Sequence, residues 1–209
     1  MKIQTVILKT ANVATLHKFY GDVLGLPCEL SSLCLSIRIG ATTLIYEQEA
    51  TFTGFYHLAF EVPHNLVDDA QSWLQARVPL LADANGHERF GPSAHWNTTN
   101  LYFADPAGNI LQLVARHGRN TAQDGPFTSG HILNVSEVGA VVDNVPIALS
   151  TLASAGLCPF NGQSDTFTAV GGHGSMLIVV PAGRGWFPTG RSAVPAPIQV
   201  ELDGGRVTL

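Results

Sequence analysis

A pattern of one strand, one helix and further strands occurs three times along this sequence, and this repeat constrains the fold more than any other feature. Each copy begins with an alternating apolar segment, continues with apolar residues at helical spacing, and ends with two strands joined by a glycine-containing turn. The copies span residues 3–50, 54–117 and 132–182. Because such a unit cannot bury its apolar face alone, we expect the copies to pack against one another.

Asparagines mark the expected helix starts, and glycines mark the turns between the last strands. Asn12, Asn65 and Asn144 stand at the helix starts, where an Asn side chain can accept a backbone hydrogen bond. In the second copy, residues 105–109 (DPAGN) predict a tight turn, since Pro fixes one dihedral and Gly and Asn tolerate positive φ. From Pro181 onward the sequence predicts an aromatic loop and one final strand rather than a fourth copy.

Three segments carry a resemblance to a known family: FYGDVLGL, FYHLAFEV and LYFADPAGNILQLVAR. They are similar to the signature of the vicinal oxygen chelate superfamily, which contains glyoxalases, bleomycin-resistance proteins and extradiol ring-cleaving dioxygenases. The resemblance covers the first two copies well and the third more loosely. It implies an α+β fold in which repeated βαβββ modules form open, cupped, mixed β-barrels around a small-molecule site.

The segment between the second and third modules is rich in Gly, Asn, Thr and Ser and shows no periodicity, which is typical of a linker. We therefore expect residues 1–120 to form one domain of paired modules, and residues 127–209 to form a third module with a C-terminal strand. An odd number of modules leaves one curved sheet without a partner inside the chain. This favours a homodimer.

Charge and composition limit the kinds of partner that this chain is expected to bind. The formal net charge is −5, 13% of residues are charged, and Lys and Arg form no cluster, which argues against a nucleic acid or an acidic membrane surface. No apolar run approaches the roughly 20 residues that span a bilayer, and the N-terminal segment lacks the features of a signal peptide. Three scattered cysteines favour a reducing compartment. We expect a cytoplasmic protein that binds a small molecule.

Strand alternation predicts that His57 and Gln112 face the inside of the cup, while Leu58 and Leu113 pack under the helices. The resemblance implies a divalent metal on this inner face, such as iron, manganese, zinc or nickel, held by a His from a first strand and a Glu from a last strand. His57 matches the His. Gln112 stands where the Glu is expected, and because its amide is neutral we expect metal binding to be weak or absent.

The pairing of modules determines which further ligand is available. Alignment on the helix starts makes Thr5, His57 and Glu137 equivalent, and alignment on the turn glycines makes Leu44, Gln112 and Ile178 equivalent. Modules one and two would bring together only His57 and Gln112, whereas modules two and three would add Glu137. A His with oxygen donors suits iron or manganese. His57, Gln112 and Glu137 are therefore the candidate metal ligands, and His57 and Glu137 the candidate catalytic residues.

Four aromatic residues are candidate ligand contacts, namely Tyr102, His95, Trp96 and Trp186. A solvated loop around His95 and an aromatic plug at Trp186 are the alternatives without a binding role.

Two functions stay open at this point. One is a metal-assisted dioxygenase, lyase or isomerase acting on an oxygenated substrate, aromatic substrates included. The other is a metal-free small-molecule-binding protein of the bleomycin-resistance type. His57 and Glu137 favour the enzyme, whereas the neutral Gln112 favours the binding protein.

Overall fold

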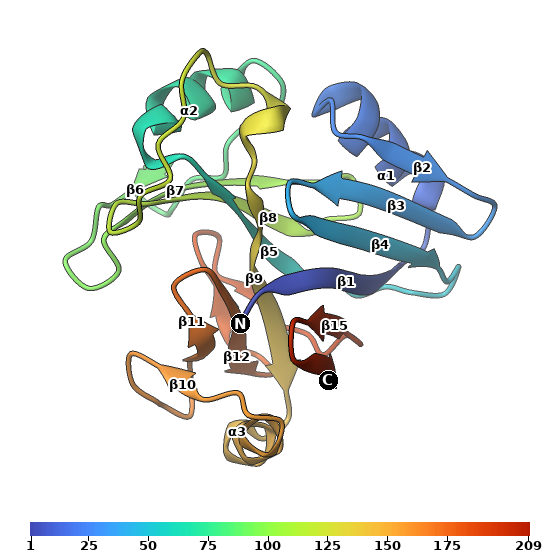
Figure 1. Cartoon of the computed structure of the whole chain (residues 1–209). Helices are drawn as coiled ribbons and strands as arrows, with labels where there is room; N and C mark the ends of the chain where they lie inside the picture. The colour runs from blue at the N-terminus through green and yellow to red at the C-terminus, as the bar shows by residue number, and fades with distance from the viewer.

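The computed structural model describes all 209 residues and folds them into three βαβββ modules and a C-terminal tail (Figure 1). The elements of the first module are β1 (Ile3–Thr10), α1 (Val13–His17), η1 (Lys18–Val23), β2 (Cys28–Leu30), β3 (Cys34–Ile39) and β4 (Thr42–Gln48). The elements of the second are β5 (His57–Val62), η2 (His64–Leu66), α2 (Val67–Gln75), β6 (Arg89–Phe90), β7 (Thr98–Ala104) and β8 (Ile110–Arg116).

The third module and the tail follow a linker that ends in the short helix η3 (Ser129–His131). The elements of this module are β9 (Asn134–Val142), α3 (Val145–Ser154), β10 (Pro159–Phe160), β11 (Thr168–Gly172) and β12 (Ser175–Pro181). The tail forms two hairpins, which are β13 (Gly185–Trp186) with β14 (Arg191–Ser192), and β15 (Gln199–Leu202) with β16 (Gly205–Thr208). None of the helices has the length and apolar character needed to cross a membrane.

Two large mixed sheets organise these elements. Antiparallel pairing of β5 with β9 joins the second and third modules into an eight-stranded sheet, in the order β10-β11-β12-β9-β5-β8-β7-β6. Antiparallel pairing of β1 with β15 joins the first module to the last hairpin, in a six-stranded sheet of order β16-β15-β1-β4-β3-β2. The hairpin β15–β16 therefore occupies the place that a fourth module would fill.

The strand pairing bears on the expected division of the chain into domains. The eight-stranded sheet crosses the expected boundary near Phe127, and the division into 1–120 and 127–209 stays a prediction. The homodimer also stays a prediction. The α+β class and the βαβββ repeat are confirmed.

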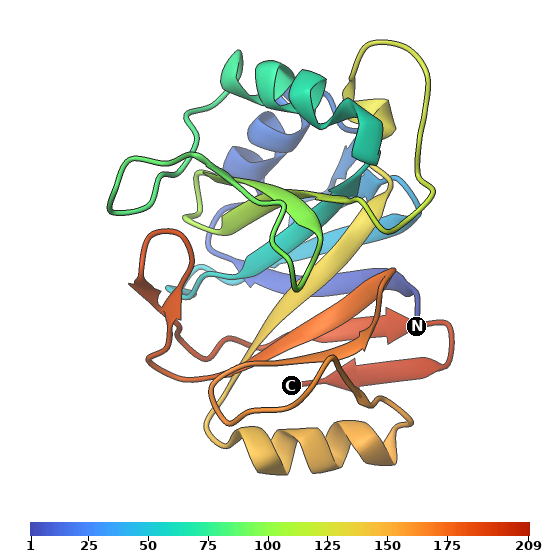
Figure 2. The ribbon, with the colours of Figure 1, turned by 90° about the vertical axis from the view of Figure 1, so that its left-hand side faces the viewer.

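One apolar core of 45 buried residues lies between the two sheets and under the helices. In β5, Leu58 and Phe60 point into this core, so that His57 and Ala59 face the opposite side of the sheet, as strand alternation predicts. A second, smaller cluster of 9 buried residues lies on that opposite, concave side. The β13–β14 hairpin stands beside the concave side (Figure 2).

The expected helix caps hold at two of three places. Asn12 accepts a hydrogen bond from the Thr15 amide (3.0 Å), and Asn144 accepts one from the Ile147 amide (3.0 Å). Asn65 does not cap α2, which begins two residues later after a 3-10 turn. Its side chain instead donates to the Gln123 carbonyl (2.8 Å) and accepts from the Gln123 amide (3.1 Å), and thereby ties the linker to the second module.

The turn at 105–109 forms as predicted and also connects two modules. Asp105 Oδ1 accepts from the Asn109 amide (3.0 Å), and Asp105 Oδ2 accepts from the Tyr20 hydroxyl of the first module (3.1 Å). Burial raises the pKa of Asp105 to about 6, although these hydrogen bonds act in the opposite direction.

The glycine-based alignment is wrong by one residue in the first module. Leu44 is fully buried in the core, and the residue that pairs with Ile7 on the other face is Ile45. The cause is the turn: Gly40 is the first residue of the two-residue turn between β3 and β4, whereas Gly174 is the second residue of the equivalent turn between β11 and β12.

Candidate functional site

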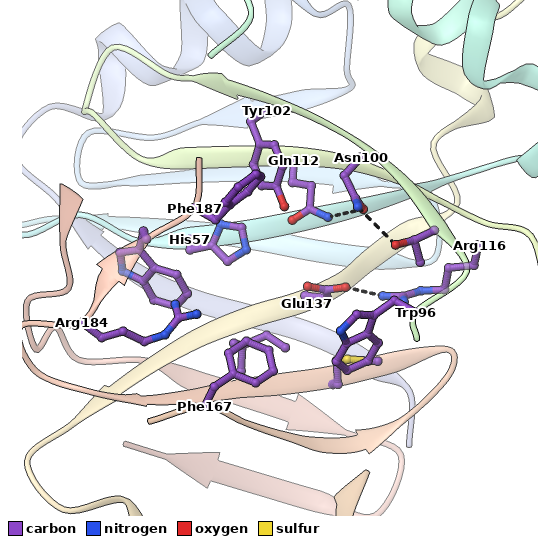
Figure 3. A pocket seen from close by; sticks show the side chains of 14 residues that line it. His57, Trp96, Asn100, Tyr102, Gln112, Arg116, Glu137, Phe167, Arg184 and Phe187 are labelled. Atoms are coloured by element: carbon purple, nitrogen blue, oxygen red, sulfur yellow. Dashed lines mark hydrogen bonds and ion pairs between the residues drawn. The ribbon is translucent and has the colours of Figure 1, made fainter. Parts of the chain in front are cut away.

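The concave face of the eight-stranded sheet encloses a pocket of about 190 Å³ (Figure 3). Strands β5, β8 and β9 contribute to its lining together with β7, β12 and the β13–β14 hairpin. Among the residues that the sequence singled out, those that line the pocket are His57, Trp96, Tyr102, Gln112, Glu137 and Trp186. His95 is exposed and lines a separate recess next to it. The functional roles of all seven stay proposals.

His57 lies in the interior of the pocket, on a strand that is hydrogen-bonded on both sides. In the parallel register of β5 with β8, His57 is opposite Ile110, and both side chains lie on the concave face of the sheet. The residue is 6% exposed, and its ring packs 4.9 Å from the Trp186 ring and 6.4 Å from the Tyr102 ring, measured between centroids. The Nδ1 atom is buried and has no hydrogen-bond partner within the protein. A buried polar atom of this kind indicates room for a ligand or water contact.

The pKa of His57 is lowered from its usual value near 6.5. The main cause is burial, which disfavours the imidazolium, and the charge of Arg184 acts in the same direction. Glu137 and the Ile110 backbone act in the opposite direction without reversing the shift. His57 is therefore neutral at neutral pH and offers one ring nitrogen to a ligand as donor or acceptor, depending on its tautomer.

Glu137 is bound by a cation from the neighbouring module. Arg116 Nη2 lies 2.5 Å from Glu137 Oε1, and the two side chains are only 5% and 14% exposed. Glu137 faces the pocket because it pairs with Ala59, which lies with His57 on the concave side of β5. The carboxylate that the metal hypothesis requires is therefore already neutralised.

A second ion pair lies farther along the same face of the sheet. Glu61 is completely buried, and its Oε2 accepts from Arg119 (2.9 Å) and from the Asn134 amide group (3.3 Å). Burial raises the pKa of Glu61, and the charges of Arg119 and Arg116 lower it. The side-chain oxygen Oε1 of Glu61 has no partner.

Gln112 takes part in a short chain of side-chain hydrogen bonds. Its amide nitrogen donates to Asn100 Oδ1 (2.8 Å), and Asn100 donates in turn to Thr98 Oγ1 (3.2 Å). This chain fixes the orientation of the Gln112 amide, so that its carbonyl oxygen is directed to the part of the pocket beside His57 (Figure 3). Gln112 is therefore a fixed hydrogen-bond acceptor.

These residues do not fit a divalent metal ion. His57 and Glu137 are the two lining residues of the types that bind metals most strongly, and Glu137 is committed to Arg116. Gln112 supplies no charge, and the equivalent residue of the third module, Ile178, has no donor atom. No group of three or more His, Cys, Asp or Glu side chains in the chain is arranged to hold an ion. The positive charge of Arg116 would in addition repel a cation beside Glu137.

The β13–β14 hairpin covers one end of the pocket with Trp186 and Phe187. Trp186 can lie this close to β9 because residue 139 is Gly: a Cβ atom there would lie 2.8 Å from the indole and 3.1 Å from His57 Cβ. Arg191 fixes the hairpin, since it donates to the Gly108 carbonyl at 2.6 Å. The tail is therefore part of the site.

The lining also contains residues outside the predicted set, of which Arg116, Asn100 and Arg184 bear most on the chemistry. Arg116 and Asn100 had a signal, because Arg116 alternates in phase with Gln112 and Asn100 stands two residues before Tyr102, which the turn places opposite Gln112. Arg184 had a weaker signal: Arg184 and Arg191 flank Trp186 and Phe187, an arrangement that suits an aromatic or anionic ligand, but no periodicity fixes the direction of the Arg184 side chain.

No protein-family model matches the chain, and no curated protein matches it. Solved structures that share its fold include a proposed dioxygenase from Bacillus subtilis, with a TM-score of 0.61 and 17% identity over 94% of this chain and 67% of the other. They also include glyoxalase I from Zea mays, with a TM-score of 0.53 and 14% identity over 86% of this chain and 66% of the other. The chain thus spans about two thirds of the length of these proteins.

At such identities the likeness establishes the fold, and the function has to be argued from the site. The chain has the fold of these dioxygenase and glyoxalase structures, which agrees with the fold that the resemblance in its sequence implies.

Proposed function

We propose that the cup of the eight-stranded sheet binds a small aromatic, oxygenated molecule through its own side chains, with no divalent metal ion between protein and ligand. The observation that carries this proposal is the buried ion pair of Glu137 with Arg116. Because the pair is already satisfied, release of Glu137 to a metal would leave Arg116 as an uncompensated buried charge. This is the binding-protein alternative that the neutral Gln112 favours.

The lining of the pocket supports an aromatic ligand. Trp96, Tyr102, Trp186 and Phe187 surround a space of about 190 Å³, which is the size of a one-ring or two-ring molecule rather than a larger drug. Aromatic side chains bind flat rings by offset stacking and edge-to-face contacts. His57 Nδ1, which lacks a partner, adds a hydrogen-bonding atom for an oxygenated substituent.

Calorimetric titration with 2-naphthamide, a neutral aromatic probe, tests the proposal when EDTA is present throughout. We expect saturable binding with one site per chain. Trp186→Leu should weaken it by at least about tenfold, because the indole forms one wall of the pocket. Trp73→Leu is the matched control, since Trp73 packs against Phe127 outside the cup and its loss should leave the affinity unchanged. Absence of saturable binding, or equal weakening by both substitutions, would contradict the proposal.

The second candidate is a metal-assisted dioxygenase, lyase or isomerase. It is favoured by one observation: the orphaned Nδ1 of His57 lies on the same concave face as Glu137 and Gln112. This candidate requires that the natural protein bind metal despite Arg116.

Titration of the metal-free protein with Mn²⁺ separates the two candidates. We expect the natural protein and Gln112→Glu to bind Mn²⁺ with a dissociation constant above about 1 mM. The reason is that Glu137 stays in its ion pair with Arg116 in both proteins. Gln112→Glu combined with Arg116→Met releases Glu137 and should gain at least about tenfold in affinity. Stoichiometric metal in the natural protein that is lost in His57→Ala would favour the enzyme instead.

A further inference from the structure

Arg184 is the cation of the cup that has no acidic partner. It directly precedes β13, its side chain is half-buried, and it lines the pocket beside Trp186 and Phe167 (Figure 3). The guanidinium carbon lies 5.7 Å from the centroid of the Trp186 ring and 5.1 Å from that of Phe167. Its one hydrogen bond within the protein is a long donation to the Gly185 carbonyl (3.3 Å). Most of the five N–H donors of this guanidinium therefore have no acceptor in the protein.

The charges on the concave face do not cancel. Arg116 neutralises Glu137 and Arg119 neutralises Glu61, and Arg184 is left over. The cup is thus locally positive in a chain whose formal net charge is −5. Because charges more than about 8–10 Å apart in water are screened at physiological salt, an anion inside the cup responds to Arg184 more than to the acidic exterior.

Because it is partly buried, the guanidinium of Arg184 needs compensating contacts. Burial lowers the pKa of Arg184, which means that the guanidinium has lost part of its hydration. Contact with the faces of Trp186 and Phe167 compensates this loss in part, through cation–π attraction. A carboxylate compensates it more fully, because two of its oxygens match two parallel N–H groups of a guanidinium.

We infer that the ligand of this cup is an aromatic carboxylate or a similar aromatic oxyanion, whose anionic group is bound by Arg184 while its ring stacks on Trp186 and Phe167. The inference rests on the proposed function and names the ligand class for the same site. Neither the ion pairs nor the Gln112 chain needs to break to admit such a ligand, since Arg184 lies outside both.

The test compares 2-naphthoate with 2-naphthamide, which share the ring and differ in charge. At pH 7 with EDTA present, we expect the natural protein to bind 2-naphthoate at least about tenfold more tightly than 2-naphthamide, a difference of about 1.4 kcal/mol. Arg184→Gln should abolish this preference and retain the affinity for 2-naphthamide. Arg38→Gln is the control, because it removes the same charge from an exposed arginine of the six-stranded sheet and should keep the preference.

Each outcome of this comparison is informative. Equal affinity of the natural protein for the two probes would overturn the inference and leave the proposed function intact. Binding of neither probe would contradict the proposed function itself. If Arg184→Gln weakens the binding of both probes to the same degree, Arg184 supports the hairpin and does not recognise the anion. The inference is then wrong. If Arg38→Gln removes the preference as well, overall charge rather than Arg184 determines it, which also overturns the inference.

Discussion

The two sheets are built from the same module, yet they differ in how their second face is covered. Every residue of β5 and β8 in the eight-stranded sheet is buried, whereas in β1 and β4 of the six-stranded sheet buried residues are interspersed with half-buried and exposed ones. The eight-stranded sheet joins two complete modules and is roofed by the β13–β14 hairpin, while the six-stranded sheet has only the β15–β16 hairpin in place of a second module. The second complete module and the covering hairpin therefore give the eight-stranded sheet its pocket.

The ion pairs on the two sheets also differ in how deeply they are buried. On the covered face Glu137 pairs with Arg116, and the two side chains are largely buried, whereas on the open face Glu201 pairs with Arg206 at the surface. Buried ion pairs are costly to break, and exposed ones contribute little. Three pairs of matched substitutions therefore test whether the covered face is a specialised site.

The largest expected effect follows from removing one member of the buried pair. Arg116→Met leaves Glu137 without its partner and should lower the free energy of unfolding by about 3 kcal/mol. Arg206→Met, at the exposed pair, should stay within experimental scatter in the same urea unfolding series. Arg116→Met combined with Glu137→Leu should recover most of the loss, because no unpaired charge remains. Similar losses for the two single substitutions would remove the contrast between the faces.

A smaller effect is expected from filling the space beside Trp186. Gly139→Val adds a side chain where even a Cβ is only 2.8 Å from the indole, and should cost about 2 kcal/mol and weaken 2-naphthoate binding. The matched residue of the first module is Ile7, which is half-exposed, and Ile7→Val should cost less than about 1 kcal/mol and leave probe binding unchanged. Thermal unfolding and calorimetry measure both. Unaltered binding in Gly139→Val would show that Trp186 need not lie on β9.

The smallest effect concerns pH. Since burial lowers the pKa of folded His57 below its unfolded value near 6.5, the unfolded chain takes up a proton first on acidification, and His57 reduces stability as pH falls below about 6.5. His57→Gln removes this contribution, so its stability should fall less between pH 7 and pH 5 than that of the natural protein. Thr5→Val, at the equivalent place in the six-stranded sheet, should show the natural pH dependence. Parallel curves for His57→Gln and the natural protein would contradict the account of His57.

Asp105 requires a second variant in the same pH series. Its pKa is raised to about 6, so the folded state is favoured as pH falls toward 4, which opposes the effect of His57. Repeating the comparison in an Asp105→Asn background removes this opposing contribution and should make the difference caused by His57→Gln easier to measure.

Much of the fold could be predicted from the sequence, because the signals are local. Alternation in β5 and β8 places His57 and Gln112 correctly, and Gly and Asn at the DPAGN turn define the hairpin between β7 and β8. The expected metal site depended on charges that local patterns do not report. Whether Glu137 meets a metal or Arg116 is decided by the pairing of β5 with β9, which is a contact between modules. Arg184 reaches the pocket from a loop, where no periodicity constrains its direction.

Amide NMR of the natural protein, titrated with 2-naphthoate in the presence of EDTA, tests the central claim most directly. If the covered face is a metal-independent site, the shifts should be confined to β5, β8, β9, the β13–β14 hairpin and the indole of Trp186, while β1 and β4 stay unperturbed. Shifts centred on the six-stranded sheet, or shifts that emerge only after Mn²⁺ or Zn²⁺ replaces the chelator, would contradict it.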